Sequence, residues 1–111
     1  MDLQNKSVLV VGSGISGIGA AESLWKVGAC PVIYDENEKL TKEDIAAKLP
    51  EGCVCEIALG TLPEEILTEL SLVVVSPGVP VDTPFMEGLK GRGLPIWGEI
   101  ELAYTLGKGK N

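Results

Sequence analysis

The feature that most constrains the fold is an apolar run that ends at a glycine-rich turn, within residues 7–19, SVLVVGSGISGIG. The apolar residues 8–11 indicate a buried strand, and a helical pattern follows the turn. Gly12, Gly14 and Gly17 have the G-x-G-x-x-G spacing of loops that join a strand to a helix. In such loops the first glycine permits the tight turn, the second lets a ligand approach the backbone, and the third lets the helix pack on the strand.

The start of the helix after this turn is predicted to bind a phosphate or a pyrophosphate. The first N–H groups of a helix have no internal partner and carry a partial positive charge, which favours anions. A second apolar run, Pro31–Tyr34, ends in Asp35, roughly 20 residues after the last motif glycine, where an acid would meet a ribose or base hydroxyl. A turn that serves only strand–helix packing is the alternative, and the order of strand, helix and acid favours ligand binding.

Length and apolar content predict a single folded domain. The chain has 111 residues and a hydrophobic fraction of 45%, which allow one sheet with helices around it. No apolar run approaches the roughly 20 residues needed to span a bilayer. The N-terminal MDLQNKS lacks the basic and small-residue pattern of a secretory signal, so we expect a cytoplasmic protein without membrane contact.

The charge and the absent residue types exclude several functions. The net charge is −7, from 9 basic and 16 acidic side chains, which disfavours nucleic acid as a partner. Phosphate binding must therefore depend on backbone amides more than on cations. The chain has no histidine, so Ser–His and Cys–His nucleophilic pairs are excluded within it. We expect no catalytic residue in these 111 residues.

The three cysteines are interpreted as structural thiols. An odd number without a secretion signal argues against disulfides. Cys53 and Cys55 lie two positions apart on a predicted strand, so both should point to one face. No further ligands are spaced to form a metal site with them. We expect Cys30, Cys53 and Cys55 to be buried or half-buried, and we expect no metal.

Strands alternate with helices five times along the chain. Strands are predicted over residues 8–11, 31–34, 53–58, 72–75 and 94–97, and helices over residues 16–27, 41–49, 63–70, 83–91 and from 98 onward. This alternation predicts an α/β fold, a Rossmann-like five-stranded parallel sheet of order 3-2-1-4-5 with helices on both faces. A ligand should bind beyond the carboxyl ends of strands one and four, where the strand order reverses.

Two loops, residues 12–17 and 76–79, should converge on that crevice, with Asp35 at one side. The crevice offers main-chain N–H groups and serine hydroxyls, but no base of suitable pKa and no activated nucleophile. No G-x-x-x-x-G-K-[ST] run is present to bind ATP. The acidic residues at 35 and 36 would repel the 2′-phosphate of NADP, whereas NAD remains a possible ligand. Glu99 and Glu101 are expected to point to different sides as a solvated face.

The segments VLVVGSGISGIGAA, YDEN, VVVSPGVP and GEIEL, in this order, resemble the N-terminal domain of the Mur ligases. The resemblance covers nearly the whole chain, and the SPG turn and the GEIEL segment are more specific than the glycine triplet. It implies that residues 1–107 form a Rossmann-like domain that holds the UDP part of UDP-N-acetylmuramoyl-L-alanine. Residues 108–111 would begin a linker to an ATP-binding central domain.

The resemblance also implies which residues bind UDP. The glycine loop would approach the diphosphate, the acid after strand two would lie by the uracil, and the turn after strand four would line the nucleotide. Asn37 stands where family members often have a basic residue. The implied substrate-binding residues are Gly12, Ser13, Gly14, Ile15, Ser16, Gly17, Asp35, Glu36, Ser76, Pro77 and Gly78.

The reaction that the resemblance implies belongs to cell-wall peptidoglycan biosynthesis. Full-length members use ATP and Mg²⁺ to activate the muramoyl-alanine carboxylate as an acyl phosphate, which the amine of D-glutamate then attacks. The groups that bind ATP, Mg²⁺ and D-glutamate lie in other domains, so this chain, expected to be a monomer, should bind one substrate and be inactive alone. The alternatives are an NAD-binding domain of a dehydrogenase and a nucleotide-sensing regulatory domain.

Overall fold

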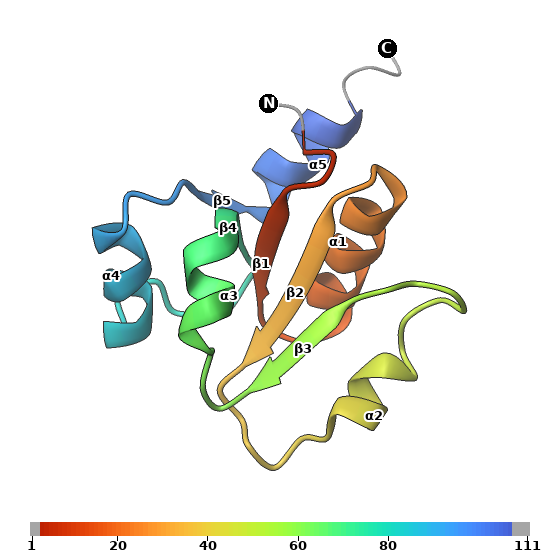
Figure 1. Ribbon diagram of the computed structural model, residues 1–111, viewed down its shortest axis with the longest axis horizontal. Helices are drawn as coiled ribbons and strands as arrows, with labels where there is room; N and C mark the ends of the chain where they lie inside the picture. Colours follow the sequence, from red (N-terminus) through yellow and green to blue (C-terminus); the bar gives the residue numbers. More distant parts are fainter. Residues whose placement is uncertain (1–2, 108–111) are drawn as a thin grey trace.

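A five-stranded parallel sheet, in the order β3-β2-β1-β4-β5, organises the computed structural model, which describes residues 3–107 (Figure 1). The strands are β1 (Ser7–Val11), β2 (Cys30–Asp35), β3 (Glu56–Leu59), β4 (Leu70–Val75) and β5 (Ile96–Gly98). Each adjacent pair of strands is parallel, so a helix-containing crossover joins one strand to the next. The predicted fold class and strand order are confirmed.

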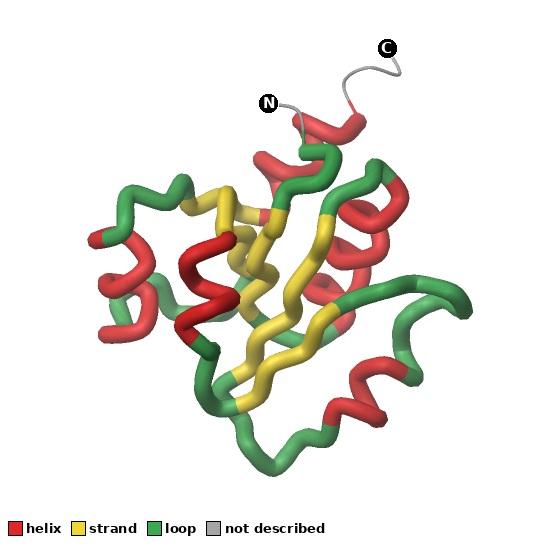
Figure 2. Tube along the Cα trace, viewed as in Figure 1, coloured by secondary structure: helices red, strands yellow, loops and turns green. Residues whose placement is uncertain are grey.

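Helices cover both faces of the sheet (Figures 1 and 2). They are α1 (Ile15–Lys26), α2 (Lys42–Ala46), α3 (Glu64–Glu69), α4 (Pro84–Gly91) and α5 (Glu99–Gly107). One core cluster contains Leu24 of α1, Ile45 of α2 and Leu102 of α5, and these helices share one face. The cluster on the other face contains Met86 of α4, with Ile66 of α3 packed against it.

The central strands are apolar on both sides because helices cover both sides. In β1, Val8 and Val10 belong to the α1 cluster, whereas Leu9 and Val11 belong to the α4 cluster. This alternation follows from the two-residue period of a strand. Leu9 and Val10 are both fully buried, as a strand at the centre of a doubly covered sheet requires.

The structure corrects the predicted third strand. The prediction placed Cys53 and Cys55 on one face of a strand over residues 53–58, but β3 begins only at Glu56, where pairing with β2 starts. The chain before it forms a turn, in which the Cys53 N–H donates to the Pro50 carbonyl over 3.0 Å. Cys53 and Cys55 are half-buried as expected, whereas Cys30, the first residue of β2, is exposed.

Strand register places the loops of interest at one edge of the sheet. Val11 pairs with Tyr34 of β2 and with Val75 of β4, so Gly12, Asp35 at the end of β2, and Ser76 follow at the same edge. The Gly12 N–H donates to the Tyr34 carbonyl over 2.7 Å, and the Ser76 N–H donates to the Val11 carbonyl over 3.1 Å. We call this the carboxyl edge. Within residues 3–107, no helix combines the length and apolar character that crossing a membrane requires.

Candidate functional site

The glycine turn after β1 is tightly packed at two of its three motif positions. Gly12 has φ +107°, a conformation that favours glycine, and a Cβ there would lie 3.1 Å from Ser76 Oγ. A Cβ on Gly17 would overlap the carbonyl oxygen of Gly12, so α1 can approach β1 only with glycine at this position. Both roles are those that the motif predicts.

Gly14 differs, because the fold itself does not require glycine there. Its φ of −74° and ψ of −168° are extended values that any residue adopts, and a Cβ would meet no atom within 4 Å. Gly14 is exposed and is the N-cap residue of α1. The open space in front of its Cα lies at the start of the helix, where an approaching ligand would be placed.

The first turn of α1 carries neither a side-chain cap nor an acidic residue of its own. Gly14 supplies no side-chain cap, and no acidic residue lies in the first turn. The other four helices within residues 3–107 all carry acids in their first turns, and threonine side chains cap α2 and α4. The N–H groups that start α1 are thus the ones left for an external anion.

Asp35 is held against the glycine turn by Ser13. Asp35 Oδ2 accepts hydrogen bonds from Ser13 Oγ over 2.7 Å and from the Ser13 N–H over 3.1 Å. Asp35 Oδ1 accepts from the Asn37 N–H over 2.9 Å. Two carboxylate oxygens can accept about four hydrogen bonds, so one acceptor position is left for a ligand.

A cavity of about 160 Å³ lies beside Asp35, and we call it the Asp35 cavity. On one wall the rings of Tyr34 and Phe85 stack with centroids 4.4 Å apart. The Tyr34 hydroxyl donates to the Gly60 carbonyl over 2.8 Å, and burial, followed by the charges of Glu36, Asp35 and Glu38, raises the Tyr34 pKa. The cavity is lined by Val11, Gly12, Tyr34, Asp35, Glu36, Gly78, Val79, Pro80, Thr83, Phe85 and Met86.

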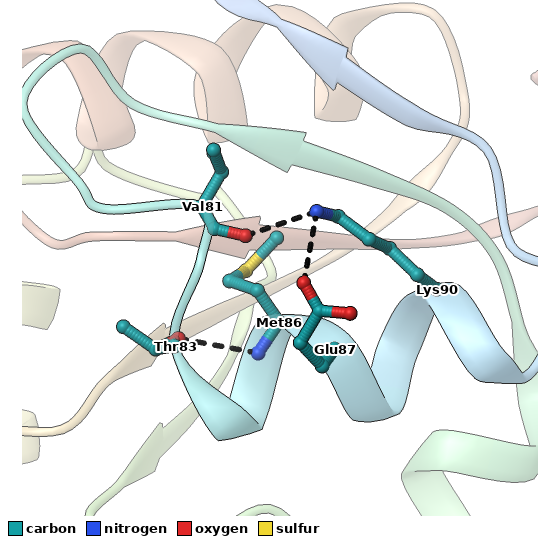
Figure 3. Close-up of polar contacts among 5 residues, drawn as sticks. All are labelled: Val81, Thr83, Met86, Glu87 and Lys90. Atoms are coloured by element: carbon teal, nitrogen blue, oxygen red, sulfur yellow. Dashed lines mark hydrogen bonds and ion pairs between the residues drawn. The ribbon is translucent and has the colours of Figure 1, made fainter.

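Polar contacts along α4 support the part of the Asp35 cavity that is lined by Thr83, Phe85 and Met86 (Figure 3). Thr83 Oγ1 accepts from the Met86 N–H over 3.3 Å and caps the helix. Lys90 Nζ donates to the Val81 carbonyl over 3.1 Å and lies 3.3 Å from Glu87 Oε2. These bonds tie the 79–83 loop to α4 and so position the Phe85 ring against Tyr34.

Two further cavities share Glu99, at the start of α5, as a lining residue. The turn cavity, about 400 Å³, is lined by residues of the turn after β4, including Ser76, Pro77 and Gly78, and by residues 96–101. The helix groove, about 560 Å³, runs between α1 and α5 and is lined at the start of α1 by Ile15 and Ser16. Among the described residues, neither the Asp35 cavity nor the turn cavity is lined by a lysine or arginine.

The structure brings the predicted site residues to one edge but divides them among these cavities. Gly12, Asp35, Glu36 and Gly78 line the Asp35 cavity, and Gly78 also lines the turn cavity. Ser13 is 6% exposed and faces Asp35 instead of an open crevice. Sequence reasoning missed the aromatic wall at Phe85, for which Thr83-Pro84, predicted as a helix start, was the available signal.

The expectation for the two acids of GEIEL is wrong in part. Glu101 Oε1 accepts from the Gly98 N–H over 2.8 Å, which fixes the start of α5. Glu99 is half-buried, and its Oε2 is fully buried without a hydrogen-bond partner among the described residues. Glu99 lines both the turn cavity and the helix groove, so it is not part of a solvated face.

These features define a Rossmann-like α/β domain whose candidate site is built mainly from backbone groups. The model of the Mur ligase MurD-like N-terminal domain family matches residues 6–98. The chain therefore belongs to this family of Mur ligase domains, as the segment resemblance implied.

The names of the curated relatives agree with membership in the Mur ligase family. The chain is 52% identical over 110 residues to a UDP-N-acetylmuramoylalanine–D-glutamate ligase of Lachnospira eligens, covering 99% of this chain and 24% of the relative. It is 49% identical over 110 residues to the ligase of the same name from Lachnoclostridium phytofermentans, again covering 99% and 24%. With that of Clostridioides difficile it shares 40% over 106 residues, covering 96% and 23%. The chain thus spans about a quarter of the length of these relatives.

Solved structures support the fold alone. A dehydroquinate dehydratase and shikimate dehydrogenase from S. pombe aligns with a TM-score of 0.63 at 18% identity, over 96% of this chain and 27% of that one. A shikimate dehydrogenase from Aquifex aeolicus aligns with a TM-score of 0.58 at 18% identity, over 96% and 47%. At such low identity the likeness gives no reason to assign dehydrogenase activity to this chain.

Proposed function

We propose that the chain binds the UDP moiety of UDP-N-acetylmuramoyl-L-alanine as the N-terminal domain of an ATP-dependent ligase that adds D-glutamate. The observation that carries the proposal is the start of α1, which has no side-chain cap and no acid in its first turn and lies at the carboxyl edge with Asp35 and Gly78. Family membership supplies the substrate class, because the curated relatives are named for this ligase.

The diphosphate would lie over Gly14, against the first N–H groups of α1 at Ile15, Ser16 and Gly17. Nothing fills the space before Gly14, and no acid in this turn repels a phosphate. The chain's net charge of −7 and the absence of cations lining the Asp35 and turn cavities, within the described residues, leave main-chain donors as the main attraction.

The uracil would occupy the Asp35 cavity. With about 160 Å³ this cavity is smaller than the roughly 300–1,000 Å³ typical of drug-sized pockets, and it suits one planar ring. Phe85 and Tyr34 offer a flat apolar wall, and the remaining acceptor position of Asp35 suits an N–H of the base. Glu36, Ser76 and Pro77 would complete the lining of the nucleotide.

The chemistry of the whole enzyme would take place outside this chain. Further domains would bind ATP, Mg²⁺ and D-glutamate, form the acyl phosphate and direct the amine onto it. This domain would hold one substrate in the cytoplasm as a monomer, and alone it would have no ligase activity. Residues 108–111, which we predict to begin the linker, lie outside the residues that the structure describes.

Titration of the ¹⁵N-labelled chain with UDP, UDP-N-acetylmuramoyl-L-alanine and NAD tests the proposal. We expect the two uridine ligands to shift the amide signals of residues 13–17 and 78, and NAD to leave them in place. The uridine ligands should also raise the melting temperature by mass action. Unmoved amide signals at saturating uridine ligand, or a larger response to NAD, would refute it.

A substitution at Gly14 separates binding from folding. Gly14→Val should lower UDP affinity by at least about tenfold, since its side chain fills the space of the phosphate, while the domain stays folded. Gly88→Val is the matched control, because Gly88 lies on the exposed side of α4 and its Cβ would also meet no atom within 4 Å. Equal UDP affinities of the two variants would remove Gly14 from the site.

A further inference from the structure

Glu99 is the one described side chain with a fully buried polar atom that has no hydrogen-bond partner. Its neighbour in the same segment, Glu101, has its Oε1 paired with the Gly98 N–H at 2.8 Å. Buried polar atoms are almost always paired, because an unpaired one loses its hydration without compensation. Glu99 would therefore gain a hydrogen bond if its carboxylate turned toward a donor in one of the two cavities that it lines.

The position of Glu99 indicates where that partner lies. Glu99 lines both the turn cavity and the helix groove, and the groove is also lined by Ile15 and Ser16 at the start of α1. Gly78 and Val79 line the turn cavity on one side and the Asp35 cavity on the other. A ligand with its base in the Asp35 cavity and its diphosphate at α1 would place its next group beside Glu99.

The chemistry of the site favours a hydrogen-bond donor over an anion or a metal ion. A carboxylate repels a phosphate, so Glu99 does not serve the diphosphate itself. The described residues contain no group of three or more histidine, cysteine or acidic side chains that could hold a metal ion, so a resident cation has too few ligands here. A hydroxyl or an amide N–H has the polarity that an unpaired carboxylate oxygen requires.

We propose that the Glu99 carboxylate turns toward the cavities that it lines and accepts a hydrogen bond from a hydroxyl or amide N–H of the amino sugar that follows the diphosphate. Glu99 is then a specificity residue that distinguishes the nucleotide sugar from UDP alone. This assignment rests on the proposed function, because it requires UDP to lie along the carboxyl edge. It adds a contact that UDP cannot make.

The test compares how much the sugar strengthens binding in two proteins. The dissociation constants of UDP and of UDP-N-acetylmuramoyl-L-alanine are measured by calorimetry for the chain and for Glu99→Gln, which keeps the size of the side chain. We expect the ratio of the UDP constant to the UDP-N-acetylmuramoyl-L-alanine constant to fall by about tenfold in Glu99→Gln, since a charge-assisted hydrogen bond is replaced by a weaker neutral one. UDP affinity should stay the same or rise, because a repelling charge has been removed.

Glu65→Gln is the matched control, since it removes an exposed carboxylate from the first turn of α3. It should leave both constants unchanged. An equal change for both ligands in Glu99→Gln, or no change, would overturn the proposal while leaving UDP binding intact. A change seen with Mg²⁺ but absent with EDTA would overturn it in favour of a bridging cation. If the unsubstituted chain does not bind UDP, the proposed function itself fails, together with this inference.

Discussion

Ser13 and Asp35 form a hydrogen-bonded pair across 22 positions of sequence, with Ser13 Oγ 2.7 Å from Asp35 Oδ2. The Ser13 N–H donates to the same oxygen, so the end of β2 is fastened to the turn that follows β1. The acid after the second strand is therefore part of the turn's own framework. Its position beside the Asp35 cavity follows from the same contact.

Asp35→Ala should destabilise the domain as well as weaken UDP binding. Loss of the carboxylate leaves the 6%-exposed Ser13 with unpaired donors, which costs about 1–3 kcal/mol in the free energy of unfolding. Urea unfolding measures this change, and a UDP titration measures the affinity. Glu36→Ala is the control, since Glu36 is exposed and its loss should cost less than about 0.5 kcal/mol. Equal stabilities of the two variants would contradict a framework role.

The glycine motif should separate into positions that serve packing and a position that serves binding. Gly17→Ala places a methyl group against the Gly12 carbonyl and should cost about 1–3 kcal/mol of stability. Gly14→Ala meets open space and should cost only about 0.5–1 kcal/mol, the difference between glycine and alanine as N-cap residues. Thermal unfolding of both variants tests the order, and a larger loss for Gly14→Ala would contradict it.

Gly14→Asp should raise stability and abolish binding together. An aspartate at the N-cap of α1 supplies the missing cap and a favourable charge, for a gain of about 0.5–1 kcal/mol. The same carboxylate would occupy and repel the proposed phosphate position, so UDP affinity should fall by more than about tenfold. Melting temperature and calorimetry measure the two effects, and a destabilised variant that still binds UDP would count against this view of α1.

The two threonine caps should differ in their effect on UDP. Thr83→Ala and Thr41→Ala each remove an N-cap hydrogen bond, at a cost of about 1 kcal/mol. Thr83 also lines the Asp35 cavity and starts the helix that carries Phe85. Thr83→Ala should therefore weaken UDP binding by about three- to tenfold, whereas Thr41→Ala should leave it unchanged. Unfolding curves and UDP titrations of both variants provide the comparison. Equal UDP affinities would separate α4 from the binding site.

Cysteine reactivity should follow burial in the structure. Burial raises the pKa of the Cys55 thiol to about 11, while Cys30 is exposed, so iodoacetamide at about pH 8 should label Cys30 well before Cys55. Mass spectrometry of the labelled sites over time measures the order. The raised pKa also means that Cys55 favours the folded state below its ordinary pKa of 9.0, and that this contribution is lost as the pH rises toward about 11. Labelling of Cys55 first would contradict its placement.

The fold was predictable because its strongest signals are local and repeated. The buried run at 8–11, its glycine turn and the alternation of strands and helices determine a doubly covered parallel sheet, and the strand order follows from where such sheets reverse. The start of β3 was not predictable in this way. Cys53 to Cys55 are apolar enough for a strand, but the partner strand β2 pairs only from Glu56 onward, and pairing is a tertiary property.

The candidate site was predictable only where backbone conformation dictates the residue. Gly12 and Gly17 can be recognised from their spacing. A side chain at Gly12 would be strained by the positive φ, and one at Gly17 would overlap the Gly12 carbonyl oxygen. The bond between Ser13 and Asp35, the ring pair of Tyr34 and Phe85, and the unpaired oxygen of Glu99 depend on side chains from different elements meeting at one edge. Contacts between side chains of different elements produce no periodic pattern in the sequence.

The open space in front of Gly14 has a consequence for inhibitors. A compound that gains its affinity from the main-chain amides at the start of α1 would depend on groups that every amino acid except proline carries. Resistance would then have to arise through a new side chain at Gly14, the position where a substitution meets no steric obstacle from the fold. That same change would fill the proposed phosphate position, so escape from such a compound would also weaken the UDP binding that we propose for this domain.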